Sequence, residues 1–286
     1  MTDLPTLREI VRDGEWLLAQ EETLVERELA RPLLERAGYE AIDVVAGVRR
    51  AGKSKLLLHM GRKMRAKGMN VRYINFEDER FSFGEKDAQN LSSILDTSKA
   101  VLLLDEPQNL PRWERWARRL HDRRVKLYIT GSNSQLLGSE LATAIGGRKR
   151  LHEVFPFSFR EVLAAKGAAN VPSDQMLRLL GEYMSKGGYP YPTVSGDYSI
   201  LNDYRNDILE RDILARHGIR DPVNLRNLSR FIMSNPGLYV SSKSIKGFID
   251  LSHVTLRRYL DHFAGAYSVI PLEKFSHSRK EQLANR

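Results

Sequence analysis

Eight consecutive residues form the strongest chemical signal in the chain. They follow the pattern G-x-x-x-x-G-K-S and are Gly47, Val48, Arg49, Arg50, Ala51, Gly52, Lys53 and Ser54. Glycines let the backbone curl until several N–H groups face one point, and Lys53 adds a full positive charge there. An apolar run at 42–46 precedes the motif, and a helix-like pattern at 53–67 adds the positive end of a helix. We predict a nucleotide-binding phosphate loop in which Ser54 supplies a hydroxyl to Mg²⁺, and we include the adjoining Lys55 in the binding set.

A second signal lies where an apolar run at 101–104 ends in two carboxylates, Asp105 and Glu106. Side chains at the carboxyl end of a parallel sheet point into the ligand crevice. We therefore expect Asp105 to hold Mg²⁺ through water, and Glu106 to orient or deprotonate the attacking water. With Lys53 at the β- and γ-phosphates, these roles predict hydrolysis of ATP to ADP. The alternative is that Asp105 only caps the helix that follows the strand.

Two further positions could complete such a site. The next strand-like run ends in Thr130, Ser132 and Asn133, each a candidate to contact the γ-phosphate or the attacking water. A strand-to-helix turn that satisfies its own backbone explains any one of them equally well. Arg148 precedes the last expected strand, where a guanidinium could reach a nucleotide bound by a neighbouring subunit. A surface arginine in a basic turn is an equal alternative.

The segments that carry these residues alternate between strand-like and helix-like patterns. Strands are expected at 42–46, 71–76, 100–105, 125–130 and 150–155, and helices at 53–67, 86–96 and 112–122. This alternation predicts an α/β fold, a parallel sheet with helices on both faces. After Pro156 the pattern is helical, at 158–166, 173–186, 200–217 and 222–234. We expect four parts, namely packed N-terminal helices (1–40), the core (41–157), a helical lid (158–235) and a winged-helix-like domain (236–286).

Two segments near the end, 242–249 and 252–263, have the size of a helix-turn-helix. In the second segment, a helix would bury the residues Leu256, Tyr259, Leu260 and Phe263. Its outer face would then carry Thr255, Arg257 and Arg258, which could contact DNA. The same face could instead bind protein or only be solvated.

Composition limits the possible classes of protein. The chain has 286 residues, of which 42% are hydrophobic, and it is long enough for about two domains. It has no cysteine, which excludes disulfides, zinc–thiolate sites and thiol nucleophiles. Its apolar runs are far shorter than the roughly 20 residues that span a bilayer, and its acidic start lacks a signal-peptide pattern. We predict a soluble cytoplasmic protein that has no membrane partner.

Charge is distributed unevenly along the chain. Residues 1–43 hold eleven acidic and five basic side chains, so the rest, with 40 basic and 25 acidic residues, carries a net charge of +15. Such a surplus attracts polyanions and favours a nucleic-acid partner, although a solvated basic face is a common alternative.

Taken together, the motifs resemble the AAA family 14 group of prokaryotic P-loop ATPases and the start of the domain that follows it there. The matching stretches are GVRRAGKS (47–54), YINFEDER (73–80), LLDEPQ (103–108), TGSNS (130–134), GR (147–148), FPFSFRE (155–161), GGYP (187–190) and DIL (212–214). The resemblance spans nearly the whole chain and implies an AAA-type ATPase core. It also implies a helical lid, then a winged helix and, in relatives, a further nuclease-like domain, which we expect this chain to lack because it stops at Arg286.

The resemblance also assigns roles to single residues. It implies that Tyr189 and Pro190 cover the nucleotide base, that Ser132 is the sensor, and that Arg148 acts between subunits of a homo-oligomeric ring such as a hexamer. Our first hypothesis is an ATPase coupled to DNA. The alternative is a nucleotide-dependent switch or assembly factor that acts on a protein. A small-molecule kinase is disfavoured by the paired acids and the helix-turn-helix.

Overall fold

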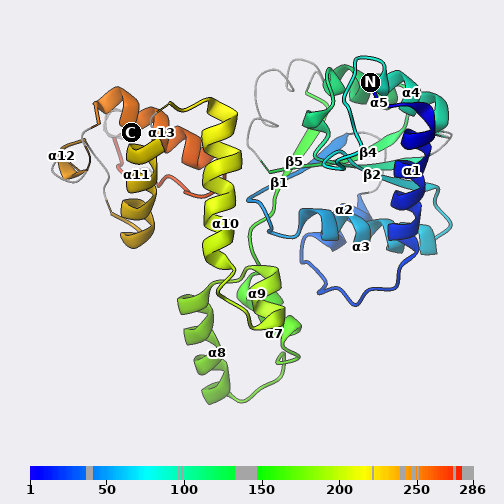
Figure 1. The fold of residues 1–286 in the computed structure, drawn as a ribbon. Coiled ribbons are helices and arrows are strands. Elements are labelled where there is room, and N and C mark those ends of the chain that lie inside the picture. Colours follow the sequence, from blue (N-terminus) through cyan, green and yellow to red (C-terminus); the bar gives the residue numbers. More distant parts are fainter. Residues whose placement is uncertain are drawn as a thin grey trace. The chain divides into compact units, whose positions relative to one another are not determined.

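The structure is a computed structural model that describes residues 1–36, 41–95, 97, 100–132, 147–220, 222–238, 242–245, 249, 251–272 and 275–278. The chain divides into two compact units, Met1–Tyr204 and Arg205–Arg286 (Figure 1). The boundary falls inside the segment 158–235 that we expect to form one lid. The predicted division into four parts stays a prediction.

A five-stranded parallel sheet forms the centre of the first unit. Its strands are β1 (Ile42–Ala46), β2 (Val71–Asn75), β3 (Val101–Asp105), β4 (Lys126–Gly131) and β5 (Lys149–Glu153). They lie in the order β2-β3-β4-β1-β5, and every adjacent pair is parallel. The α/β fold class and the parallel sheet are therefore confirmed. Strands β1, β3 and β4 are buried along their whole length because helices cover both faces, which explains their unbroken apolar runs.

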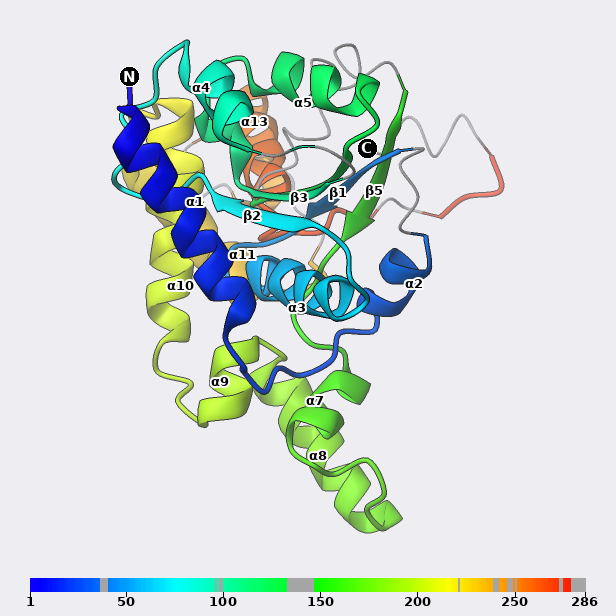
Figure 2. The ribbon, with the colours of Figure 1, turned by 90° about the vertical axis from the view of Figure 1, so that its right-hand side faces the viewer.

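Helices flank this sheet on both sides. Figure 2 shows α2 (Ala30–Glu35) and α3 (Lys53–Ala66) on one face, and α4 (Asp87–Ile94) and α5 (Trp113–Asp122) on the other. Helix α1 (Leu4–Ala19) runs along the β2 edge. A Cβ on Gly14 would lie 2.0 Å from the carbonyl oxygen of Tyr73, so only glycine permits this close approach of α1 to β2.

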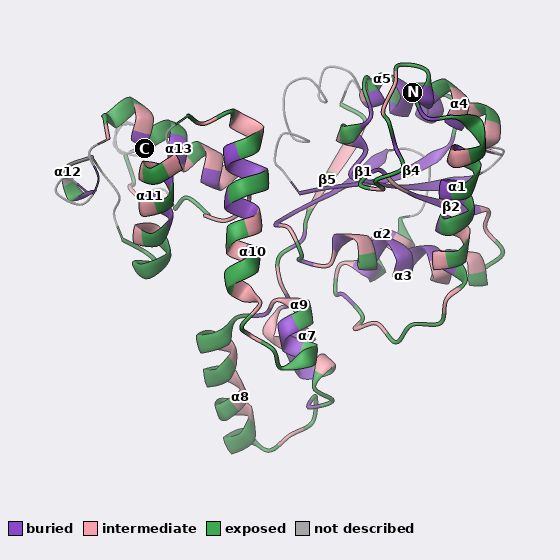
Figure 3. Ribbon diagram, viewed as in Figure 1, coloured by how far each residue is buried: buried purple, intermediate pink, exposed green. Residues whose placement is uncertain are grey.

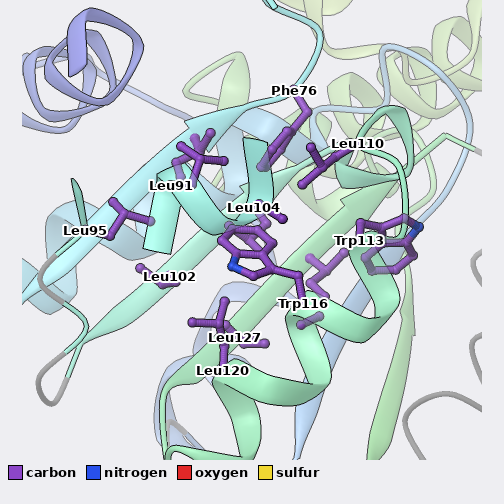
Figure 4. Close-up of a cluster of buried hydrophobic side chains, with 14 of the residues drawn as sticks. Phe76, Leu91, Leu95, Leu102, Leu104, Leu110, Trp113, Trp116, Leu120 and Leu127 are labelled. Atoms are coloured by element: carbon purple, nitrogen blue, oxygen red, sulfur yellow. The ribbon is translucent and has the colours of Figure 1, made fainter. Parts of the chain in front are cut away.

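The main core lies between the sheet and helices α4 and α5 (Figure 4). Trp116 and Leu120 of α5 pack toward Leu102 of β3 and Leu127 of β4, and these four residues and Trp113 are buried. The indole N–H of Trp116 donates to the Ser92 hydroxyl at 2.8 Å, so the one polar group of this side chain is satisfied. Burying each such side chain contributes about 1.5–3 kcal/mol, which makes the sheet a rigid base for residues at its edge.

Helices follow the sheet, as expected from the pattern after Pro156. They are α7 (Phe159–Ala165), α8 (Ser173–Lys186), α9 (Pro190–Ser195) and α10 (Leu201–Asp207), which continues as the π-helical segment η3 (Ile208–Ala215). Figure 3 shows buried residues concentrated in the sheet, whereas α8 has none. Among the described residues, no helix is both long and apolar enough to cross a membrane.

The second unit is helical in the residues that the structure describes. It contains α11 (Pro222–Ser234), α12 (Ser242–Ile245) and α13 (His253–Gly265). Helix α13 begins where the Ser252 hydroxyl accepts from the Thr255 N–H at 3.2 Å. Within the segment expected at 242–249, residues 246–248 lie outside the described residues, and the Ile249 N–H donates to the Ile245 carbonyl at 3.1 Å. The winged-helix architecture stays a prediction.

Candidate active site

The G-x-x-x-x-G-K-S motif forms a loop between the carboxyl end of β1 and the start of α3. A Cβ on Gly47 would lie 2.0 Å from the carbonyl oxygen of Val154, so glycine is required where the loop leaves the sheet. Gly52 takes the left-handed conformation (φ +93°) at the N-cap of α3. The Lys53 ammonium donates to the carbonyl oxygens of Gly47 at 2.9 Å and Val48 at 3.0 Å. This buried ammonium therefore lies within the curl of the loop, and the first N–H groups of α3 follow it.

Other charged residues of the predicted binding set contact acidic partners around the loop. Arg49 donates to Glu77 at 3.2 Å. Lys55 is exposed and donates to Glu22 at 2.6 Å, in the segment between α1 and α2. Lys55 therefore contacts this neighbouring segment, and its predicted part in nucleotide binding stays a prediction.

The carboxylate of Asp105 is held from two neighbouring strands at the end of β3. Tyr73 of β2 donates its hydroxyl to one oxygen at 2.6 Å, and Thr130 of β4 donates to the other. Asp105 is only 3% exposed, so both hydrogen bonds are shielded from water. Burial raises the pKa of Tyr73, and the charge of Asp105 raises it further, so this hydroxyl remains a donor at neutral pH.

Glu106 lies beside Asp105 and is also buried, with 7% exposure. Its backbone is left-handed (φ +54°), and its N–H donates to the Thr130 hydroxyl at 3.2 Å. One carboxylate oxygen accepts from the N–H of Ser132 at 3.1 Å, from the Ser132 hydroxyl at 3.2 Å, and from the Gln108 amide. The structure thus brings Asp105, Glu106 and Ser132 together, because β4 lies between β1 and β3.

The buried environment of the Glu106 carboxylate suits a general base. Burial raises the pKa of this carboxyl above its ordinary value, the positive charge of Lys53 opposes the rise, and the charge of Asp105 adds to it. A carboxylate with a raised pKa accepts a proton more readily near neutral pH. Tyr73 and Gln108 lie within two of the stretches that carry the resemblance, YINFEDER and LLDEPQ, but no role was expected for either side chain.

The donor types at Ser54 and Asp105 fit Mg²⁺. This ion takes oxygen ligands and usually keeps several waters, so one hydroxyl and one carboxylate beside a nucleotide's phosphates suffice. Ser54 lies in the first turn of α3, half-buried. Among the described residues, no group of three or more His, Cys, Asp or Glu side chains forms a metal cluster.

The turn before α9 lies against the phosphate loop. A Cβ on Gly52 would lie 3.6 Å from Cγ of Pro190. The Arg50 guanidinium lies 4.4 Å from the ring centroid of Tyr204, and Tyr189 contacts the same ring edge-on, with centroids 5.5 Å apart. Two residues predicted to cover the base, Tyr189 and Pro190, are thus next to the loop, although their predicted contact with a base stays a prediction.

Arg27 is the main residue near the loop that the sequence does not indicate. Its guanidinium donates to the Ala51 carbonyl at 2.6 Å, to the Phe155 carbonyl at 2.7 Å, and to the Glu161 carboxylate at 2.9 Å. It also lies 5.1 Å from the Phe157 ring centroid and is only 8% exposed. A single arginine in an acidic stretch has no periodic or motif signal, so only the fold could identify it.

Arg148 does not join these residues within one chain. Its carbonyl accepts from the N–H of Ile42, at the amino end of β1, and its guanidinium donates to Asp122 at 2.6 Å. The phosphate loop leaves the opposite end of β1, four residue steps or roughly 13 Å away. The finger role stays a prediction that requires a neighbouring subunit. The candidate sensor Asn133 lies outside the described residues.

The predicted DNA-contacting residues lie on α13 in the second unit. Arg257 and Arg258 are exposed, and Arg258 lies 5.9 Å from the ring centroid of Tyr259. Thr255 is half-buried, and its hydroxyl shares a hydrogen bond with that of Ser252 at 2.9 Å. The expected outward direction of the two arginines is confirmed, whereas contact with DNA stays a prediction.

Comparison with known families agrees with this geometry. Residues 39–163 match a family described as "AAA domain", and residues 177–286 match a family described as a domain of unknown function. The first match agrees with the parallel sheet and the phosphate loop: residues 39–163 are similar to P-loop domains of the AAA type.

Two curated relatives are similar over most of this chain. An uncharacterized protein of Methanocaldococcus jannaschii is 31% identical over 84% of this chain and 58% of its own length. An uncharacterized protein of Haemophilus influenzae is 31% identical over 82% of this chain and 63% of its own length. The chain therefore spans about three fifths of the length of these relatives.

Two solved structures are similar at low identity. AMPPCP-bound DnaA from Aquifex aeolicus is 12% identical, with a TM-score of 0.42 over 83% of this chain and 86% of that one. The Thermotoga maritima RuvB Holliday junction branch migration motor is 15% identical, with a TM-score of 0.38 over 87% of this chain and 91% of that one.

Proposed function

We propose that this chain hydrolyses ATP with Mg²⁺ and couples hydrolysis to DNA binding or remodelling as a homo-oligomer. The observation that carries the ATPase half is the buried Glu106 carboxylate, held by Ser132 and Gln108 beside Asp105. Buried charge is costly, and two adjacent buried carboxylates at a sheet edge need a functional reason. Water activation next to a phosphate loop supplies that reason.

Each residue has a separate task in this proposal. The loop N–H groups and Lys53 bind the β- and γ-phosphates, and Lys53 exchanges its two carbonyl contacts for phosphate oxygens. Ser54 and Asp105 would hold Mg²⁺, which would withdraw charge from the phosphate oxygens when bound. Glu106 orients the attacking water and accepts its proton. Ser132 divides its hydroxyl between Glu106 and the γ-phosphate, as a sensor would.

The assembly half of the proposal depends on Arg148. Because this guanidinium is at the far end of β1 from the loop, it can serve only a nucleotide held by a neighbour. It must exchange Asp122 for that nucleotide, and both side chains are about half exposed, so the exchange costs little. A ring such as a hexamer would place one such arginine at every interface.

The DNA half depends on α13 and on charge. Thr255, Arg257 and Arg258 lie on one helix, and arginine binds phosphates through two parallel hydrogen bonds. The alternative is a nucleotide-dependent switch that acts on a protein partner. It is favoured by Val254 on the same helix, which is 77% exposed and suits an apolar contact more than a phosphate backbone.

ATP turnover tests both halves in one experiment. Phosphate release is measured on protein of known oligomeric state, alone and with single-stranded, duplex and branched DNA, with and without Mg²⁺. We expect Mg²⁺-dependent release that at least one DNA form stimulates. Release that no DNA form changes favours the protein switch, and no release with any form contradicts the ATPase assignment.

A further inference from the structure

We propose that Arg27 is a positioning residue for the phosphate loop, and that Glu161 in turn positions Arg27. This inference rests on the proposed function, since it assumes that the loop binds a nucleotide. Arg27 lies far from the motif in sequence, in a segment without regular structure between α1 and α2.

The contact with Ala51 carries the argument. Ala51 immediately precedes Gly52 in the loop, and its carbonyl accepts from Arg27 at 2.6 Å. The peptide unit is planar and trans, so its C=O and N–H point in opposite directions. By holding the Ala51 carbonyl on one side, Arg27 turns the Gly52 N–H away from its own guanidinium. Arg27 therefore orients a phosphate-binding donor without touching the phosphate.

Glu161 fixes the orientation of the guanidinium. Its Oε1 accepts from Arg27 at 2.9 Å and from the Glu28 N–H at 2.8 Å, while Oε2 accepts from the Ser158 N–H at 2.9 Å. Ser158 and Glu161 also form the capping box of α7, so the carboxylate is fixed by its own helix. A planar guanidinium with three directed acceptors has little rotational freedom.

The same guanidinium links the loop to the turn that carries Tyr189. Arg27 lies over the Phe157 ring, and the Phe157 N–H donates to the Gly188 carbonyl at 2.7 Å. The Tyr183 hydroxyl donates to the Phe157 carbonyl at 3.0 Å. One buried side chain thus touches both the phosphate loop and the support of the predicted base-covering turn.

The segment that carries Arg27 is held independently of it. Glu22 pairs with Lys55 at 2.6 Å, and Glu26 pairs with Lys63 at 2.5 Å, both on α3. Shortening the Arg27 side chain should therefore leave the segment in place. It would, however, leave Glu161 as a buried, uncompensated charge, which lowers stability by itself. Stability and positioning must be separated in the test.

Two measurements separate stability from positioning. The thermal midpoint of each variant reports stability, and equilibrium binding of a fluorescent ADP analogue reports positioning of the loop. We compare wild type with Arg27→Ala, Arg27→Lys, Glu161→Gln and the double variant Arg27→Ala/Glu161→Gln. Arg31→Ala is the matched control, since Arg31 lies four residues away and forms an exposed pair with Glu35. Binding is measured well below each midpoint, so that only folded protein is titrated.

We expect Arg27→Ala to bind about ten- to hundredfold more weakly, because a charged hydrogen bond to the loop is lost. Arg27→Lys should recover part of the affinity, since one ammonium can reach the Ala51 carbonyl but cannot fill all three contacts. The double variant should regain thermal stability, because it no longer buries the unpaired charge of Glu161. It should still bind the ADP analogue weakly. Arg31→Ala should match wild type in both measurements.

Two results would overturn the inference. Wild-type affinity in Arg27→Ala removes any positioning role, and recovery of both stability and affinity in the double variant shows that Arg27 acts only on the fold. Failure of the proposed function looks different, because wild type itself would then bind the ADP analogue no better than Lys53→Ala.

Discussion

The carboxyl edge of the sheet and the outer face of α13 both carry residues with a predicted function, but they are built differently. At the sheet edge, Asp105 is held by Tyr73 and Thr130, and Glu106 by Ser132. On α13, Arg257 and Arg258 are exposed, and Arg258 lies 5.9 Å from the ring centroid of its neighbour Tyr259.

The difference reflects the chemistry expected of each region. Phosphoryl transfer requires groups held in position before the reaction, because the rate falls steeply with misplacement. Binding a polyanion requires positive charge that can follow a phosphate backbone, and mobile side chains serve this purpose. Substitutions at the sheet edge should therefore have large, all-or-none effects, whereas those on α13 should be graded and dependent on salt.

The largest effect is expected for Lys53→Ala. The substitution removes the ammonium that lies within the curl of the loop. The β- and γ-phosphates then lose the full positive charge that Lys53 would place beside them. We expect no measurable ATP binding or turnover, with little change in thermal midpoint. Calorimetric titration with ATP checks this, and unchanged nucleotide affinity would refute the phosphate-loop assignment.

Arg148→Ala should have the next largest effect on ATP turnover if Arg148 acts across a subunit interface. Loss of an arginine finger lowers turnover by about 10³-fold or more. Activity per subunit should rise with protein concentration in wild type. Mixing Arg148→Ala with Lys53→Ala subunits should restore some turnover, because mixed interfaces pair an intact loop with an intact arginine.

Two outcomes would contradict the finger role of Arg148. Normal hydrolysis by Arg148→Ala, or full activity in a monomer, would leave Arg148 as a surface charge paired with Asp122. The sheet edge of one chain would then hold all the groups that hydrolysis requires, without any residue from a neighbouring subunit.

Glu106→Gln should lower turnover by at least about a hundredfold while ATP still binds. Glutamine keeps the hydrogen-bonding oxygen that Ser132 contacts, but it is far too weak a base to accept the water's proton. Single-turnover measurements with saturating ATP separate binding from hydrolysis. Wild-type turnover in this variant would move the catalytic role to another residue.

The same variant makes a prediction about pH. Because burial raises the pKa of Glu106 in the folded state, the folded protein binds this proton more tightly than the unfolded chain does. This carboxylate therefore costs stability increasingly as pH rises through the raised pKa. Glu106→Gln should have the higher thermal midpoint at neutral pH, and the difference should shrink as pH falls toward the ordinary pKa of glutamate.

The smallest effect is expected for the double substitution Arg257→Ala/Arg258→Ala. Basal ATP turnover should remain, while DNA affinity and the steepness of its salt dependence fall by about one unit of log–log slope per lost phosphate contact. Replacing Arg160 and Arg178, which are 87% and 75% exposed, removes equal charge from the first unit as a control. Equal losses in both variants would show that only total charge matters.

Much of the fold follows from local patterns. The five strands lie within one or two residues of their expected positions. Strands β1 and β3 are short, mostly apolar and fully buried runs, whereas β5 has only one apolar residue, Leu151. The phosphate loop and the Asp105–Glu106 pair were predictable because their residues are adjacent in sequence.

Contacts between distant residues were decided only by the tertiary structure. Arg27 is 24 residues from Ala51 and 134 from Glu161, and no spacing rule connects such positions. The sequence alone predicted a phosphate loop between a strand and a helix, and two acids after a buried strand. Only folding placed Arg27 behind that loop, set Tyr73 and Thr130 on Asp105, and separated Arg148 from the site. The physical reason is that strand order and helix packing bring remote side chains together. Both depend on the whole core, and no single segment specifies them.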